Sequence, residues 1–110
     1  MSDIINDYFE SFDMDREGFH VYPRLQCVDG FEISVQARAG CYCKPRENNA
    51  FPYYAVECGY PSGPVPELAE WKDTPESPDE NTVYGYVPTH VVVKLIESHG
   101  GLSPPKEAKP

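Results

Sequence analysis

Long apolar runs and basic residues are both scarce in this sequence. No apolar run approaches the roughly 18 residues that a membrane-spanning helix needs. The first residues, MSDIINDYFESF, also lack the basic start and the apolar stretch of a signal peptide. We therefore expect a protein that stays in the cytoplasm where it is made.

Basic residues are outnumbered by acidic ones, with 9 Lys plus Arg against 18 Asp plus Glu and a formal net charge of -9. Nucleic-acid affinity comes largely from Lys and Arg side chains that displace counterions from phosphates. An anionic membrane surface would repel the chain for the same electrostatic reason. The charge therefore disfavours direct binding of DNA, RNA or membranes.

Recognised catalytic signatures are absent as well. The sequence contains no G-x-S-x-G elbow, Walker loop, H-E-x-x-H pair or G-x-G-x-x-G turn. We therefore expect a protein that is not an enzyme, and we assign no catalytic residue.

The four cysteines, spaced C-x13-C-x-C-x14-C, lack the paired knuckles of structural zinc sites. The preferred interpretation is that Cys27 and Cys58 are small core residues, while Cys41 and Cys43 are free thiols in a loop. It implies no metal and no cofactor. The alternative is a small zinc-stabilised interaction module, in which Cys41 and Cys43 bind zinc together with His20, Cys27 or Cys58.

The length of 110 residues predicts one domain, over residues 1–102, followed by a disordered tail at 103–110. Apolar spacings of three and four residues predict a helix at 3–12. Alternation on both sides of Asp29-Gly30 predicts a β-hairpin with a two-residue turn. Further strands are expected at 53–58 and 82–87. Thr89 is expected to cap a last helix, which runs from 90 to 99 and ends at Gly100.

The segment between the last two strands is long and rich in proline, and only residues 67–72 are able to form a helical turn. Val65, Leu68 and Trp71 have the spacing to anchor it. Together the elements predict an α+β fold, an antiparallel sheet of about four strands with an N-terminal and a C-terminal helix packed on one face. The alternative is a more barrel-like β fold that keeps only the C-terminal helix.

Acidic residues gather in two segments, 1–17 and 67–80. Charge runs often do no more than keep a small protein soluble. The sharper hypothesis is that folding joins both segments into one negative face, which would attract a basic surface on a partner protein. The residues assigned to this face are Asp3, Asp7, Glu10, Asp13, Asp15, Glu67, Glu70, Asp73, Glu76, Asp79 and Glu80.

Eight tyrosines are the other prominent feature. Strict alternation predicts that Tyr84 and Tyr86 share one face of a strand and that Tyr53 and Tyr54 point to opposite faces. Some tyrosines must therefore be exposed, where they serve either as rigid anchors at a protein interface or in ordinary cross-strand packing. Beside Tyr42, the residues Arg38, Lys44 and Arg46 form a basic rim that is too small to indicate nucleic-acid binding.

Several segments between residues 25 and 102 resemble a group of small, mostly uncharacterised phage-encoded accessory proteins. The segments are DGFEISVQ at 29–36, CYCKPR at 41–46, YAVECGYPS at 54–62, and YGYVP at 84–88 with HGG at 99–101. The resemblance implies a protein that acts in an infected bacterial cytoplasm, and it brings no established catalytic residues.

Small acidic phage proteins of this kind are often inhibitors of host defence, including anti-CRISPR and anti-restriction proteins that imitate the charge of DNA. By this analogy the leading hypothesis is a non-enzymatic inhibitor that binds the basic nucleic-acid-binding surface of a host defence protein or ribonucleoprotein complex. It would contact neither nucleic acid nor a membrane directly. The alternatives are the zinc-stabilised module and a phage structural or assembly protein, and the sequence leaves the oligomeric state open.

Overall fold

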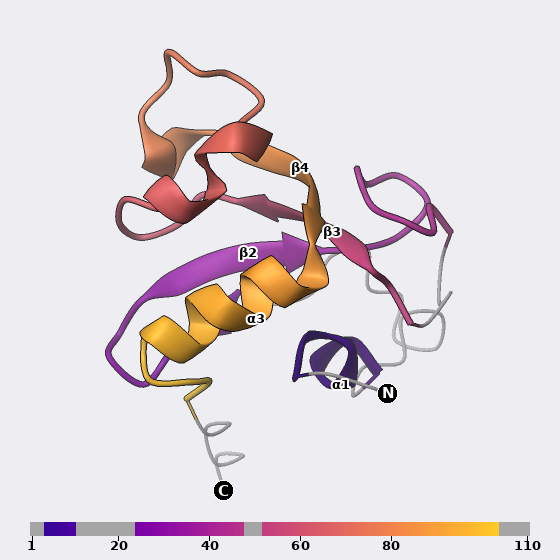
Figure 1. The fold of residues 1–110 in the computed structure, drawn as a ribbon, viewed down its shortest axis with the longest axis horizontal. Helices are drawn as coiled ribbons and strands as arrows, with labels where there is room; N and C mark the ends of the chain where they lie inside the picture. Colours follow the sequence, from indigo (N-terminus) through magenta and orange to yellow (C-terminus); the bar gives the residue numbers. More distant parts are fainter. Residues whose placement is uncertain (1–3, 11–23, 48–51, 104–110) are drawn as a thin grey trace, which may run out of the picture.

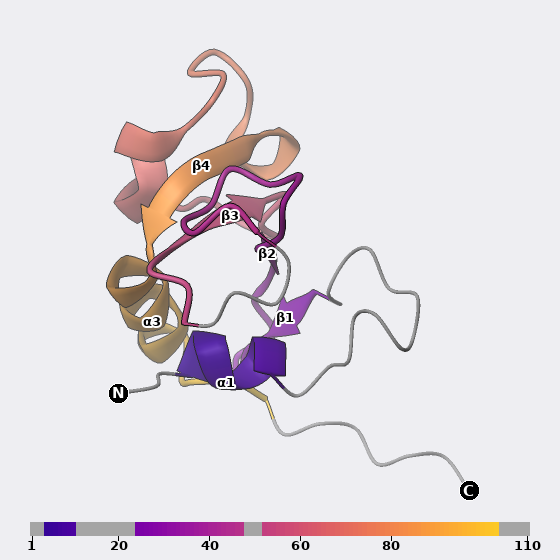
Figure 2. The same cartoon turned by 90° about the vertical axis from the view of Figure 1, so that its right-hand side faces the viewer.

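The fold is built on a four-stranded antiparallel sheet with two helices on one side of it (Figure 1, Figure 2). The computed structural model describes residues 4–10, 24–47 and 52–103. The strands β1 (Leu25–Gln26), β2 (Glu32–Gln36), β3 (Ala55–Gly59) and β4 (Val83–Pro88) are adjacent in chain order. The helices are α1 (Ile4–Glu10) and α3 (Thr89–Ser98). The predicted α+β fold is confirmed.

A single hydrophobic core joins these elements. Its fully buried side chains come from both helices and from the sheet, and they include Ile5 and Phe9 of α1, Ile33 of β2, Val56 of β3 and Ile96 of α3. The two helices also contact each other. Because every apolar stripe packs into the same core, the elements stabilise one another. Within the described ranges, no helix is long and apolar enough to cross a membrane.

Helix α1 has seven residues, all inside the range predicted for the first helix. So short a helix is not stable alone in water. Its buried Asn6 side chain fixes it to Tyr53, two residues before β3. The Nδ2 group donates to the carbonyl oxygen of Tyr53 at 2.8 Å, and the Oδ1 atom accepts from the Tyr53 N–H at 2.7 Å. Asn6 therefore pairs with Tyr53 much as a neighbouring strand would.

The predicted hairpin is present, but its loop has three residues instead of two. Leu25 pairs with Ile33, and the Cys27 N–H donates to the Phe31 carbonyl at 2.8 Å, which leaves residues 28–30 as the loop. Gly30 has a φ of 98°, in the left-handed region where glycine is favoured. A three-residue loop that ends in a left-handed glycine is a common hairpin connection. Asp-Gly therefore predicted the turn correctly but not its length.

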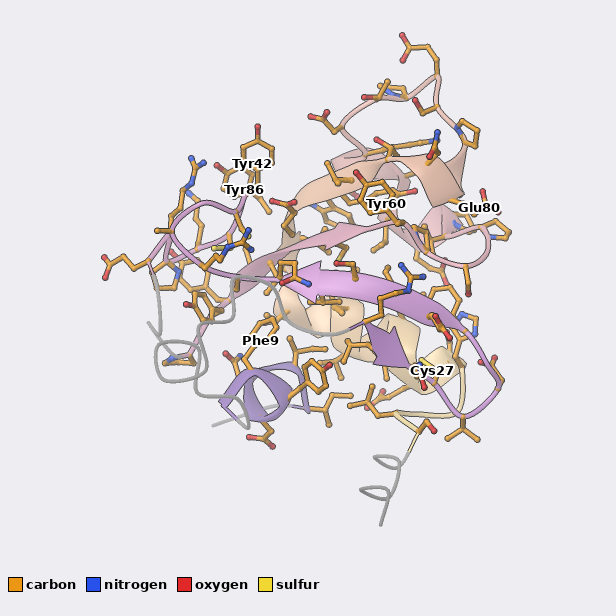
Figure 3. The ribbon with its side chains drawn as sticks, turned by 180° about the vertical axis from the view of Figure 1, so that it is seen from behind. Phe9, Cys27, Tyr42, Tyr60, Glu80 and Tyr86 are labelled. Carbon is orange, nitrogen blue, oxygen red and sulfur yellow. The ribbon has the colours of Figure 1, made fainter. Side chains whose placement is uncertain are left out.

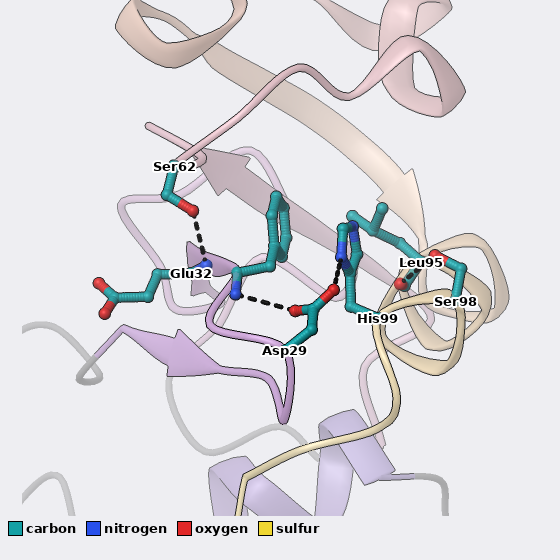
Figure 4. A network of polar contacts seen from close by, with 7 residues as sticks. Asp29, Glu32, Ser62, Leu95, Ser98 and His99 are labelled. Carbon is teal, nitrogen blue, oxygen red and sulfur yellow. Dashed lines mark hydrogen bonds and ion pairs between the residues drawn. The ribbon is translucent and has the colours of Figure 1, made fainter.

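A polar contact ties this hairpin loop to the end of α3 (Figure 4). The Asp29 Oδ2 atom lies 2.7 Å from His99 Nδ1, and Asp29 Oδ1 accepts from the Phe31 N–H at 3.0 Å. The Phe31 ring stacks on the His99 ring with centroids 4.0 Å apart. These hydrogen bonds, first from the Phe31 N–H and then from His99, lower the pKa of Asp29 below its usual value. Gly100, with a φ of 90°, ends the helix as predicted.

The start of α3 differs from the prediction. Pro88 precedes the helix as its N-cap residue, and Thr89 is the first helical residue rather than the cap. The Thr89 N–H donates to the Tyr54 carbonyl at 3.0 Å, and the hydroxyl lies 3.5 Å from the same oxygen. Thr89 therefore binds the segment before β3 instead of capping its own helix.

The prediction that Tyr84 and Tyr86 share a face is wrong. Tyr84 is fully buried, whereas Tyr86 is 40% exposed. Val56 of β3 pairs with Val87 of β4, and Cys58 of β3 pairs with Tyr84 of β4. One residue separates the two positions in β3 and two residues separate them in β4, so β4 carries one extra residue. Such a bulge breaks the alternation of side chains. At this bulge Tyr86 adopts a φ of 57° and faces outward. The other prediction holds, because Tyr53 is buried and Tyr54 is exposed.

The proline-rich connection between β3 and β4 packs along the free edge of β4. It contains the 3-10 helices η1 (Pro66–Trp71), which confirms the predicted helical turn, and η2 (Asp79–Asn81). Val65 and Leu68 are buried, and Trp71 packs on the core, so the predicted anchors are confirmed. An isolated β-bridge joins Lys72 to Tyr84. The connection therefore has a fixed position beside β4.

Candidate partner-binding site

The second acidic segment presents most of its carboxylates to solvent. Five of its six assigned residues are exposed, and no ion pair joins them to any residue that the structure describes; these are Glu67, Glu70, Asp73, Glu76 and Glu80. The sixth, Asp79, is only partly exposed and lies 2.9 Å from Lys72 Nζ. Its other carboxylate oxygen accepts the Val65 N–H at 2.9 Å.

Both contacts lower the pKa of Asp79, the one with Lys72 more strongly. Asp79 therefore holds the connection together and contributes little negative charge to the surface. Because Asp79 also neutralises Lys72, the remaining five carboxylates dominate the field of this segment. We call the surface of residues 66–81 the acidic connection.

The first acidic segment does not join the acidic connection in the part that is described. Asp7 is exposed on α1, which lies at the opposite end of the molecule from the 66–81 segment in both views (Figure 1, Figure 2). The backbone of Glu10 ends α1. The Glu10 side chain and the assigned residues Asp3, Asp13 and Asp15 lie outside the described residues. The hypothesis of one continuous face is therefore wrong for the described carboxylates, since α3 and the sheet separate Asp7 from the acidic connection.

A pair of exposed tyrosines lies beside the acidic connection. Tyr42 and Tyr86 are 42% and 40% exposed, and their ring centroids are 5.7 Å apart (Figure 3). Two backbone contacts position Tyr42: its N–H donates to Glu57 Oε1 at 2.8 Å, and its carbonyl oxygen accepts the Tyr86 N–H at 3.0 Å. The exposed Tyr60 lies apart from this pair, toward Glu80 in the same view.

The tyrosine pair and the acidic connection together line an open groove of about 420 Å³. Its walls are formed by Tyr42, Glu70, Trp71, Lys72, Asp73, Gly85 and Tyr86. We call it the tyrosine groove. It brings together the loop before β3, the end of η1 and the bulge of β4. Sequence reasoning named its tyrosines and acids separately but did not bring them together, because the groove depends on contacts between distant segments.

Two of the three basic residues expected beside Tyr42 lie over the protein's own tyrosine rings, while the third, Arg38, donates to Cys41 Sγ at 2.8 Å. The Arg46 guanidinium carbon lies 5.4 Å from the centre of the Tyr42 ring, and the Lys44 ammonium lies 5.8 Å from that of Tyr86. Both distances are within the range of cation–π attraction. Neither cation lines the tyrosine groove. The groove walls thus keep an excess of negative charge.

The four cysteines are free thiols, and all are buried. Cys27 and Cys58 are core residues as predicted, while Cys41 and Cys43 lie in a loop that is itself packed. Burial raises the pKa of Cys41 to about 11, and it also raises the pKa of Cys43. Losing a proton, which zinc binding requires, is therefore harder for these thiols than for an exposed cysteine. In the described part of the chain, no three His, Cys, Asp or Glu side chains could share a metal ion; His20 lies outside it.

Comparison of the chain with protein-family models, with curated proteins and with solved structures finds no match. The site must therefore be interpreted from its own geometry and charge.

Proposed function

We propose that this chain is a non-enzymatic binding protein whose acidic connection and tyrosine groove dock on a basic surface of a partner protein. The observation that carries the proposal is that one connection holds five exposed carboxylates, none with an ion pair among the described residues, and that two of them, Glu70 and Asp73, line a groove with an exposed tyrosine pair. The charged segment supplies attraction at a distance, and the aromatic rings supply contact area.

Both parts have a physical role in association. Complementary charge speeds diffusional encounter and selects the partner, and its effect weakens as salt rises. Tyrosines bury a large, rigid area with little loss of conformational entropy, and they are enriched at protein interfaces. The groove holds both kinds of group on well-anchored elements, so little ordering is needed when a partner binds.

The partner class that we propose is a host defence complex with a basic nucleic-acid-binding groove, met in the cytoplasm of an infected bacterium. The sequence resemblance to phage accessory proteins and the net charge of -9 support this choice. Of the two acidic segments, the proposal needs only the one in the acidic connection. It does not need the carboxylates of residues 1–17 to lie on the same face.

The test is capture of a partner from bacterial lysate by the immobilised chain, followed by washing at about 50 mM and about 500 mM salt. We expect the captured protein to be retained at low salt and largely released at high salt. The double variant Glu67→Gln/Glu76→Gln removes two charges from the acidic connection outside the groove, and it should retain clearly less of the same protein at low salt.

The matched control is Asp7→Asn/Glu97→Gln, which removes the same number of exposed charges from α1 and α3. This control should capture as much partner as the unaltered chain. If both variants lost captured partner equally, only the net charge of the chain, and not the position of the charges, would govern binding. Retention that is independent of salt and of both variants would contradict docking through the acidic connection.

A further inference from the structure

The walls of the tyrosine groove carry more negative than positive charge. Glu70 and Asp73 both line it, and no ion pair in the described residues neutralises either. The one cation in its wall, Lys72, is already held by Asp79 at 2.9 Å. A ligand that enters the groove therefore meets two carboxylates and no free positive charge on its walls, which favours a cationic group.

The remaining walls are aromatic. Tyr42, Tyr86 and the single tryptophan, Trp71, contribute rings to the same groove. The face of an aromatic ring carries partial negative charge and attracts cations, most strongly in tryptophan. Two of these rings already lie within cation–π distance of a cation, Tyr42 of Arg46 and Tyr86 of Lys44, and neither cation lines the groove.

The backbone at Tyr86 directs its ring into the groove. A φ of 57° is unfavourable for a tyrosine, and such a conformation persists only where the surrounding structure imposes it. Here the β4 bulge and the hydrogen bond from the Tyr86 N–H to the Tyr42 carbonyl impose it. The result is a ring that faces the groove instead of the core.

We propose that the tyrosine groove binds an arginine side chain of the partner, with its guanidinium group against the aromatic rings and paired with Glu70 or Asp73. This inference rests on the proposed function and names the group that is recognised. Arginine fits better than lysine because its planar guanidinium stacks on aromatic rings and can donate two parallel hydrogen bonds to one carboxylate.

The direct test is a titration of the purified chain with N-acetyl-arginine methylamide, followed by the fluorescence of Trp71. Because Trp71 is the only tryptophan and lines the groove, its emission reports occupancy there. We expect a saturable change with a Kd of about 1–10 mM, as is reasonable for so small a ligand. The citrulline analogue has nearly the same shape without the charge, and it should bind at least about tenfold more weakly. The lysine analogue should also bind more weakly.

Substitutions of residues that line the groove test whether arginine binds there. Glu70→Gln/Asp73→Asn should weaken arginine binding by about tenfold or more, and Tyr86→Leu should weaken it clearly. The matched control is Tyr60→Leu, because Tyr60 is also exposed and has a φ of 51° but does not line the groove. This control should bind like the unaltered chain. Circular dichroism of each variant verifies that it is folded.

No saturable change up to about 50 mM arginine derivative would overturn the inference, as would equal binding of the citrulline or lysine analogue. The two proposals fail separately. Partner capture that depends on Glu67 and Glu76 but is unaffected by Glu70→Gln/Asp73→Asn would retain the proposed function and reject the arginine site. Arginine binding without salt-sensitive partner capture would retain the arginine site and reject the proposed function.

Discussion

Gly85 lies against the side chain of Tyr42, between two tyrosines of β4. A Cβ atom added at Gly85 would meet the Tyr42 Cβ atom at 3.1 Å and its ring at 3.3 Å. Only glycine allows Tyr42 to pack this closely over the strand. The sequence motif Tyr-Gly-Tyr therefore serves a specific contact, which could not be predicted because Tyr42 lies more than forty residues away in the chain.

Gly85→Ala should displace Tyr42 slightly and cost about 1 kcal/mol of stability, the low end for overpacking. The control is Gly63→Ala, because nothing lies within 4 Å of a Cβ atom at Gly63 and both substitutions stiffen the unfolded chain equally. Urea denaturation monitored by Trp71 fluorescence measures the free energy of unfolding of both variants. Equal stabilities of the two variants would show that Tyr42 does not pack on Gly85.

At the scale of elements, sequence periodicity predicted the helices and strands because each buries a stripe of apolar side chains in one core. It could not predict the features that depend on distant partners. The bulge at Tyr86 is bound to the Tyr42 carbonyl, and Thr89 is bound to the Tyr54 carbonyl. The same limit applies to the site. The sequence indicated the acidic segment and the presence of some exposed tyrosines, but neither which tyrosines are exposed nor the groove that they line.

The buried Asn6 side chain anchors helix α1 to Tyr53 through two hydrogen bonds. Asn6→Ala removes two hydrogen bonds to the buried Tyr53 backbone, and it should lower the free energy of unfolding by about 2–4 kcal/mol. Asp7→Ala, at the exposed neighbouring position, should change it by less than about 0.5 kcal/mol. Chemical denaturation of the two variants makes the comparison. Similar small effects of both would mean that α1 is held by its apolar side chains alone.

The contact between the hairpin loop and α3 predicts a pH dependence of stability. The pKa of Asp29 is lowered in the folded chain, so its stabilising contribution is present above the usual value of 3.8 and is lost as the pH falls through the lowered value. Asp29→Asn should reduce this acid-induced loss. Asp79, whose pKa is also lowered, should account for part of what remains.

Free energies of unfolding measured between neutral pH and about pH 3 provide the test. The curves of the unaltered chain and Asp29→Asn should converge as the pH falls. Parallel curves over the whole range would show that the Asp29 carboxylate is not specifically stabilised by Phe31 and His99.

On the scale of the whole molecule, the described carboxylates of the two acidic segments lie at opposite ends. The acidic connection lies beyond β4, whereas Asp7 of α1 lies at the far side of α3 (Figure 1). Charge composition alone could not predict this separation, since it is set by the order of the strands. We therefore expect the molecule to meet its partner through the end that carries both the acidic connection and the tyrosine groove.

The most direct test of this central claim is a hydroxyl-radical footprint of the chain, free and in complex with its captured partner. Aromatic side chains are the reporters, and the chain offers them at both sites. Tyr42, Trp71 and Tyr86 should become protected in the complex, while Tyr8 of α1 should react equally in both states. Protection of Tyr8 with unchanged reactivity of the three groove residues would contradict the account.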